Sequence, residues 1–460
     1  MKALSYFYRT NMTNHLTPQG AAAQPNPPCE RNAWRPVIGM GAALALWLPL
    51  AAHAIEFGPN GMFSLNGFGE VTFGHATNYC GNCQLEAGEA KDRSWADTLV
   101  PGREYKSRGT NFTQVQPFLG AKLDLGKGYK LSGLLSQNWR DGMEDVPGFW
   151  REKNIALSHE DYGSVRFGAM TTRTWSVADY PYGTNVGLSG PWASSGAGYG
   201  MLTNALRYTS RILDVADGDL VLEATYDTGN TDFKVNKPAF WELYAQYHRG
   251  DLVVDATVQD AQNGTPSAWS HGPFTGLTPS AADDRYLSSS SQGIALVMAR
   301  YQIDPKLEVS GGIRRNWWSG ANAVQNPVTQ QWNNMINVDW DGTLNGVKNP
   351  GYAAMSIDVM AGLRYRMGQW TASGGVVHLG TALTGNPSDR GQKNSALIGV
   401  LGLQYDYGNG FKVNVQTGAV HYARLGLSPM SMPSNSSFTE VDSRVARDGN
   451  WITVGALYAF

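Results

Sequence analysis

The chain ends in the stretch Trp451-Ile-Thr-Val-Gly-Ala-Leu-Tyr-Ala-Phe460, which reads as a β-strand. Side chains of a strand point alternately to opposite faces. One face here carries only uncharged residues, namely Ile452, Val454, Ala456, Tyr458 and Phe460. An apolar face with aromatic residues near its end is typical of a strand whose outer side meets lipid. A half-buried strand of a soluble β-sandwich shows the same alternation, so one strand does not distinguish a membrane barrel from a soluble sandwich.

A repeated pattern of a hydrophobic residue, any residue and a tyrosine favours the membrane protein. It occurs as Leu206-x-Tyr208, Ala245-x-Tyr247, Ala299-x-Tyr301, Leu363-x-Tyr365, Leu403-x-Tyr405 and Ala456-x-Tyr458. Most of these units lie beside a short polar turn or the C-terminus. Tyrosines at one level around a barrel form an aromatic girdle at a membrane interface, whereas a soluble sandwich has no reason to align them.

Alternation from Phe63 onward predicts about sixteen strands, an even number as in bacterial barrels. They are expected near 63–74, 113–125, 129–140, 150–159, 164–173, 205–213, 219–228, 239–249, 251–261, 292–303, 307–318, 353–367, 369–380, 395–407, 411–424 and 450–460. Short connections alternate with long ones, as in barrels with tight periplasmic turns and long external loops. The expected fold class is all-β: a transmembrane antiparallel β-barrel.

The two faces of the predicted strands differ in polarity. In residues 353–367, Ile357, Val359 and Leu363 alternate with Asp358 and Arg364. A charge at the middle of a bilayer costs roughly 2–4 kcal/mol, so the charged face must line the interior. The sequence therefore predicts a polar, hydrated lumen.

Residues 1–54 differ from the rest of the chain. Arg31 and Arg35 precede an apolar run over 37–51, which ends in Ala52-His53-Ala54. These features predict a signal peptide with an extended N-terminal region, and a single barrel domain over 55–460. A membrane anchor helix is the alternative. It is disfavoured because the run is short for a span and no stop-transfer charges follow it.

Charge and motifs exclude several other functions. A formal net charge of -2 argues against nucleic acid as a partner. Cys80 and Cys83 are spaced for a small disulfide loop in an oxidising compartment, because the helical context of a redox CxxC site is missing. No HExxH or GxSxG pattern occurs, so we predict no catalytic residues, no metal site, no cofactor and no enzyme activity.

The chain resembles the general porins of Gram-negative bacteria, of the sixteen-stranded trimeric type found in betaproteobacteria. The resemblance rests on the segments 65–74 (LNGFGEVTFG), 155–168 (IALSHEDYGSVRFG) and 204–210 (NALRYTS), and on the terminal YAF. It implies a homotrimer in the outer membrane, surrounded by lipid, whose water-filled channels pass small hydrophilic solutes and ions. It also implies that Phe460, with Tyr458, supports membrane assembly.

In that family the segment after the fifth strand folds into the barrel and narrows it, which here implies residues 174–204. A pore selects by size and by charge at its narrowest part. By strand parity, the inward charges near this segment include Arg140, Arg166, Arg207 and Glu70. Arg173 lies near the root of the segment, and the segment itself adds Asp179, Tyr180 and Tyr182. Because Asp179 is the only acidic residue in the segment, we expect a weak anion preference. Alternatively, the charges lie far from the narrowing and only hydrate the lumen, while the aromatic residues pack the segment onto the wall.

Two other functional classes remain. The chain could form a non-conducting outer-membrane barrel that serves as a hydrolase or an adhesion scaffold. It could also be a secreted soluble β protein. The signal peptide, the girdle and the asymmetry of the connections favour the channel.

Overall fold

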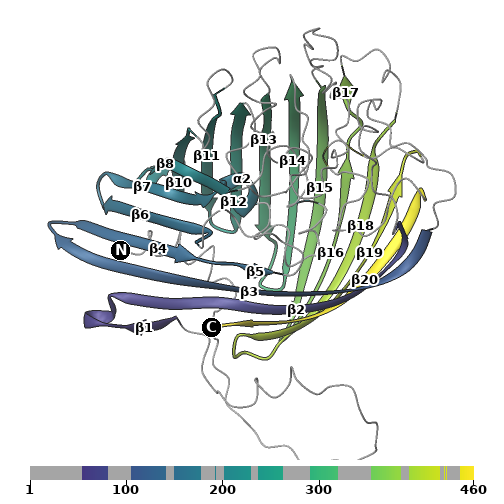
Figure 1. Ribbon diagram of the computed structural model, residues 1–460, viewed down its shortest axis with the longest axis horizontal. Helices are drawn as coiled ribbons and strands as arrows, with labels where there is room; N and C mark the ends of the chain where they lie inside the picture. The colour runs from purple at the N-terminus through teal and green to yellow at the C-terminus, as the bar shows by residue number, and fades with distance from the viewer. Residues whose placement is uncertain are drawn as a thin grey trace, which may run out of the picture.

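The computed structural model describes residues 54–80, 105–140, 150–177, 192, 201–228, 237–262, 291–319, 354–384, 393–424, 429, 431 and 446–460. These residues form one antiparallel sheet that closes on itself, and Figure 1 shows it as a continuous curved wall. No helix in these ranges has both the length and the apolar character needed to cross a bilayer.

Sixteen strands make the ring. They are β2 (Phe63–Cys80), β3 (Tyr105–Gly126), β4 (Tyr129–Ser136), β6 (Glu152–His159), β7 (Gly163–Thr171), β8 (Met201–Thr209), β10 (Gly218–Asp227), β11 (Ala239–Arg249), β12 (Leu252–Gln262), β13 (Ser291–Gln302), β14 (Leu307–Ser319), β15 (Ala354–Met367), β16 (Trp370–Leu379), β18 (Ala396–Asp406), β19 (Phe411–Tyr422) and β20 (Asp448–Ala459). The predicted strand number and antiparallel barrel are confirmed.

Four short strands extend the edges of this ring. They are β1 (Ile55–Phe57), β5 (Trp139–Arg140), β9 (Leu213–Val215) and β17 (Leu383–Thr384), which pair with β2, β3, β10 and β15 respectively. The strand expected at 129–140 is therefore divided into β4 and β5. The segment expected at 174–204 is shorter than predicted, because β8 already begins at Met201, and Met201 and Leu202 pair with β7.

The barrel closes where the C-terminus meets β2. Residues 68–76 of β2 pair with β20, and the backbone of Gly67 exchanges two hydrogen bonds of 3.0 and 2.9 Å with Phe460. Glycine is required here, because a Cβ on Gly67 would lie 2.5 Å from the carbonyl oxygen of Gln116 and 3.0 Å from the Phe460 ring. No open sheet edge is left at this seam, as a span through lipid demands.

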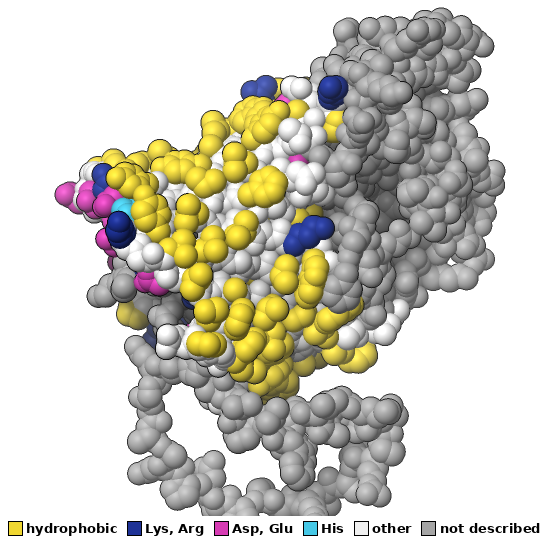
Figure 2. Space-filling view, turned by 60° about the vertical axis from the view of Figure 1, so that its left-hand side comes forward, with side chains coloured by type: hydrophobic (Ala, Val, Ile, Leu, Met, Phe, Trp, Pro, Cys, Tyr) yellow, Lys and Arg dark blue, Asp and Glu magenta, His cyan; other side chains and the backbone are white. Residues whose placement is uncertain are grey.

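The outer face is apolar, and the predicted facing of the strands is confirmed. On β15, Ile357 and Leu363 are 46% and 50% exposed, whereas Asp358 between them is fully buried. Figure 2 shows hydrophobic side chains spread broadly over one outer face, with charged side chains gathered mainly at its edge. Because these apolar side chains are exposed, the outer face is suited to contact with the hydrocarbon of a lipid bilayer.

Aromatic side chains gather at the end of the barrel that carries the short turns. Tyr405 contacts Trp370 and Tyr407, with ring centroids 4.8 and 4.7 Å apart, and Tyr458 lies 6.3 Å from Phe460. Tyr208, Tyr301 and Tyr365 are also exposed at this end. The arrangement agrees with the predicted girdle.

Candidate functional site

A row of polar side chains crosses the inner wall over five neighbouring strands. Arg166 of β7 lies opposite Arg207 of β8, which lies opposite Thr225 of β10. Thr225 in turn lies opposite Glu242 of β11, and Glu242 opposite Gln259 of β12. All five point inward, because the exposed residues of the outer face alternate with them along each strand, namely Phe167, Leu206, Tyr226, Leu243 and Val258. The register of the sheet thus brings residues far apart in sequence into one site.

The two arginines of this row are opposite one another, an arrangement that is unfavourable unless other groups compensate the charge. Arg207 donates hydrogen bonds of 2.8 Å to Thr225 Oγ1 and 2.9 Å to the Thr171 carbonyl oxygen, and lies 3.5 Å from Glu242. Arg166 donates to Asn154 Oδ1 at 2.5 Å. Each guanidinium is therefore held by its own partners.

Helix α2 (Arg173–Val177) follows β7 and is attached to this row. The backbone nitrogens of Arg173 and Thr174 donate to the Glu242 carboxylate at 2.8 and 3.1 Å. The Thr174 hydroxyl lies 3.0 Å from Glu242 and 2.6 Å from Gln259. Glu242 thus satisfies N–H groups that have no partner at the start of a helix, and it ties α2 to the inner side of β11 and β12, beside which Figure 1 places it.

A buried ion pair joins α2 to β10. Arg173 forms a two-pronged pair with Glu223, with Nη2 2.8 Å from Oε1 and Nε against Oε2. Burial of the Arg173 guanidinium works to lower its pKa, but the charge and hydrogen bonds of Glu223 outweigh this and raise the pKa above its usual value. Arg173 is therefore a fixed positive charge at the start of the segment.

A second attachment of the segment lies at Trp192, on the inner side of β13 and β14. Its carbonyl oxygen accepts a 2.9 Å hydrogen bond from Arg314, whose guanidinium stacks 4.5 Å from the centroid of the Trp192 ring. The indole nitrogen lies 3.3 Å from the sulfur of Met298. A Cβ on Gly312 would approach the Trp192 ring at 3.1 Å, so glycine leaves room for it.

Arg314 is held by a fully buried ion pair. It lies 2.8 Å from Asp358 of β15, and neither side chain is exposed. Asp358 also accepts hydrogen bonds from Asn316 at 2.7 Å and from the Gly380 backbone at 2.9 Å. Since such a pair is stable only with good geometry and further hydrogen bonds, this network fixes one position for Trp192.

Of the residues predicted for the site, Arg166, Arg173 and Arg207 lie together. Glu70 faces inward on β2 and accepts a 3.3 Å hydrogen bond from Thr72. By register Glu70 lies opposite Gln114, which lies opposite Arg140, but the Arg140 side chain is outside the described residues. So are Asp179, Tyr180, Tyr182 and Cys83, together with the side chain of Cys80.

The acidic partners of the arginines were not predicted from the sequence. Asp179 was expected to be the acidic residue facing the inward arginines, whereas Glu223 and Glu242 lie directly among them. Their parity in the predicted strands 219–228 and 239–249 already indicated an inward direction. Further inward ion pairs join Glu308 to Arg300 and Arg364, and Lys412 to Asp406. Among the side chains that the structure describes, no three His, Cys, Asp or Glu residues are grouped to hold a metal ion.

Comparison with known proteins identifies the fold. No family model matches the chain, and no curated protein matches it by sequence. An anion-selective porin from Comamonas acidovorans has a TM-score of 0.54 at 13% identity, over 86% of this chain and 99% of that one. The outer membrane protein OmpT of Vibrio cholerae has a TM-score of 0.52 at 13% identity, over 88% and 100%. OmpF of Salmonella typhi, in complex with daunomycin, has a TM-score of 0.51 at 14% identity, over 87% and 100%.

Proposed function

We propose that this chain, which has the fold of sixteen-stranded porins, forms a water-filled channel in the outer membrane of a Gram-negative bacterium. Small hydrophilic solutes and ions would pass through it by passive diffusion. The observation that carries the proposal is the opposite polarity of the two faces of the barrel: the outer face exposes Ile357, Leu363 and their equivalents, while the inner face carries hydrogen-bonded charges. A hydrocarbon surrounding and an aqueous lumen are the solvents that these faces require.

The proposal includes an exported, non-enzymatic homotrimer. Residues 1–54 would serve as the cleaved signal peptide, as their sequence pattern predicts. The trimer is proposed by resemblance, and the absence of a nucleophile and base pattern in the sequence supports a channel over a hydrolase.

We further propose that the segment from α2 to Trp192 narrows the channel. Its two attachments support this, because Thr174 is bound to β11 and β12 while Trp192 is bound to β13 and β14. The chain would then cross the inside of the barrel wall between these strands. Arg166, Arg173 and Arg207, with Glu223 and Glu242, lie at its base and would set the charge of the passage.

Three arginines against two glutamates give this part of the wall an excess of one positive charge, so we propose a weak anion preference. Replacing both Arg166 and Arg207 with Gln should shift the reversal potential in a salt gradient in the direction that indicates a higher permeability for cations relative to anions. The permeability ratio should change on the order of twofold to fivefold, since a unit charge acts by about 1 kcal/mol at 4 Å in water. Asp179→Asn should shift it in the opposite direction.

The measurement is the reversal potential across planar bilayers at low salt. Its matched control is Arg211→Gln, which removes an exposed arginine from the short connection after β8 and should change nothing. The shifts should shrink as salt rises, because charges are screened within about 8 Å at physiological ionic strength. Conducting protein with unchanged selectivity in both the double variant and Asp179→Asn would show that these charges do not set the selectivity.

A further inference from the structure

A carboxylate lies on the outer face of the barrel, where the strands expose mainly apolar side chains. Asp260 is on β12, between the inward-facing Gln259 and Ala261. It lies directly opposite Trp241 of β11, which is 38% exposed on the outer face. Each of these two residues is two positions from the end of its strand that meets a long connection. Asp260 is therefore near the level at which the apolar outer face meets the external water.

Two neutral donors hold the Asp260 side chain in place. Its Oδ1 accepts hydrogen bonds from the Ser291 hydroxyl at 2.7 Å and from the Trp317 indole nitrogen at 2.9 Å. The Trp317 ring lies across Gly293, where an added Cβ would be 2.2 Å from Cζ2 of the ring. Only glycine leaves this space, so the indole is held against the wall beside the carboxylate. Along the row of opposed residues, Asp260 is thus flanked by Trp241 on one side and by Trp317 on the other.

The negative charge of Asp260 has no counter-ion among the residues that the structure describes. None of them forms an ion pair with it, and its Oδ2 accepts no hydrogen bond from them. Oδ2 is not enclosed, although the residue as a whole is only 9% exposed. Arg315, which is exposed on the same face, donates instead to the sulfur of Met355 at 3.5 Å. An ionised side chain with so little contact with water needs a compensating positive charge.

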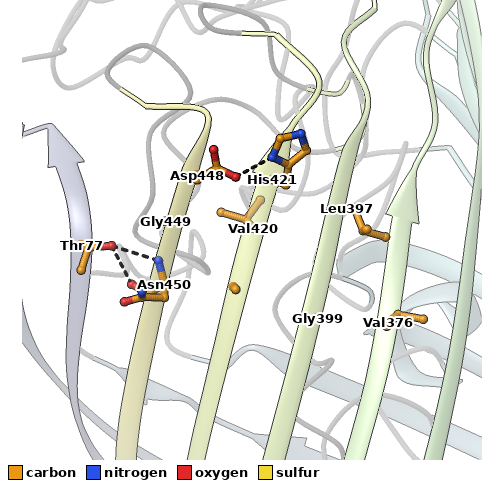
Figure 3. Close-up of a pocket in the computed structure, with 10 residues that line it drawn as sticks. Thr77, Val376, Leu397, Gly399, Val420, His421, Asp448, Gly449 and Asn450 are labelled. Carbon is orange, nitrogen blue, oxygen red and sulfur yellow. Dashed lines mark hydrogen bonds and ion pairs between the residues drawn. The ribbon is translucent and has the colours of Figure 1, made fainter.

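Another carboxylate of the outer face has a basic partner. Asp448 of β20 lies 2.5 Å from Nδ1 of His421, the contact drawn in Figure 3. Arg447 lies 3.2 Å from the other ring nitrogen of His421. Basic side chains thus surround Asp448, whereas tryptophans flank Asp260. The two sites differ in what they leave for a ligand, because only Asp260 still lacks a cation.

We propose that Asp260, Trp241 and Trp317 bind an organic ammonium group that reaches the outer face from the external solution. A carboxylate beside aromatic rings recognises such cations, because the ring faces attract the positive charge and the carboxylate neutralises it. A metal ion fits less well, since it requires several oxygen ligands. Val258 and Leu243, which are 40% and 55% exposed on the same two strands, would contact the hydrocarbon attached to the nitrogen. The inference does not depend on conduction.

Equilibrium dialysis of the folded protein in a non-ionic detergent tests the proposal, with choline as the probe and dimethylbutanol, its uncharged carbon analogue, as the comparison. Asp260→Asn should weaken choline binding about tenfold, because it removes the charge and keeps an acceptor for Ser291 and Trp317. Trp241→Leu should weaken it about threefold to tenfold through loss of a cation–π contact. The matched control Asp251→Asn removes an exposed carboxylate at the opposite end of β12 and should bind choline normally.

Equal choline binding by wild type and Asp260→Asn would overturn the proposal, and so would wild-type protein that binds dimethylbutanol as well as choline. A changed number of chains in the assembly of Asp260→Asn, with choline binding unchanged, would also overturn it, because the missing cation would then come from another copy. Heat-modifiable mobility on electrophoresis shows that each variant is folded. Solute flux through every variant should equal that of wild type. Loss of flux with normal choline binding would count against the channel and leave the ammonium site intact.

Discussion

Replacing Arg314 with Met is expected to destabilise the folded barrel by about 3–5 kcal/mol, the usual effect of removing one partner of a buried ion pair. Asp358 would stay buried with its negative charge uncompensated, because both side chains are fully inaccessible in the structure. Trp192 would also lose the guanidinium under its ring and the donor to its carbonyl oxygen. The measurement is the free energy of unfolding in urea, in detergent micelles.

Two further variants make this result specific. Arg314→Met combined with Asp358→Asn should recover most of the stability, because no charge is then left buried while an oxygen can still accept from Gly380. Arg366→Met makes the same substitution at an exposed position of β15 and should change the free energy by no more than about 0.5 kcal/mol. A single Arg314 variant as stable as wild type would show that the ion pair is not what fixes Trp192.

Deleting Phe460 should reduce the amount of assembled, heat-resistant barrel at least about tenfold. Two backbone hydrogen bonds to Gly67 would be lost, each worth about 0.5–1.5 kcal/mol in water and more where lipid excludes it. The ring contact with Tyr458 would be lost as well. Phe460→Tyr keeps the backbone and an aromatic ring, so it should assemble nearly normally. Membrane fractions analysed by electrophoresis with and without heating give the result, and normal assembly of the deletion variant would refute this role of the terminal residue.

The strands could be predicted because, within each strand, apolar side chains that face outward alternate with polar side chains that face the lumen. This alternation disappears where both faces are polar, and the strand ends that were predicted wrongly lie in such stretches. β2 continues to Cys80 and β3 starts at Tyr105, several residues beyond the predicted ends, through stretches such as His75-Ala-Thr77 that have no apolar face. The polar pair Gln137-Asn138 likewise separates β4 from β5.

The candidate site could be predicted only in part. Parity placed Arg166 and Arg207 on the inner face, but their partners depend on the register between strands, which alternation alone does not fix. Only the structure therefore identified Glu223 and Glu242 as partners of the arginines. The buried ion pair of Arg314 and Asp358 was likewise found only in the structure. Trp192 lies within the segment 174–204, and its packing against Met298 and Arg314 agrees with the alternative that aromatic residues pack this segment onto the wall.

Osmotic swelling of proteoliposomes tests most directly whether the barrel encloses a water-filled path. Folded wild-type protein should make liposomes swell in small sugars such as arabinose. If the segment bound at Thr174 and Trp192 narrows the channel as proposed, the rate should fall steeply for larger sugars such as raffinose. Heat-modifiable mobility on electrophoresis confirms that the protein used is folded. Folded protein that admits no sugar of any size would contradict the channel.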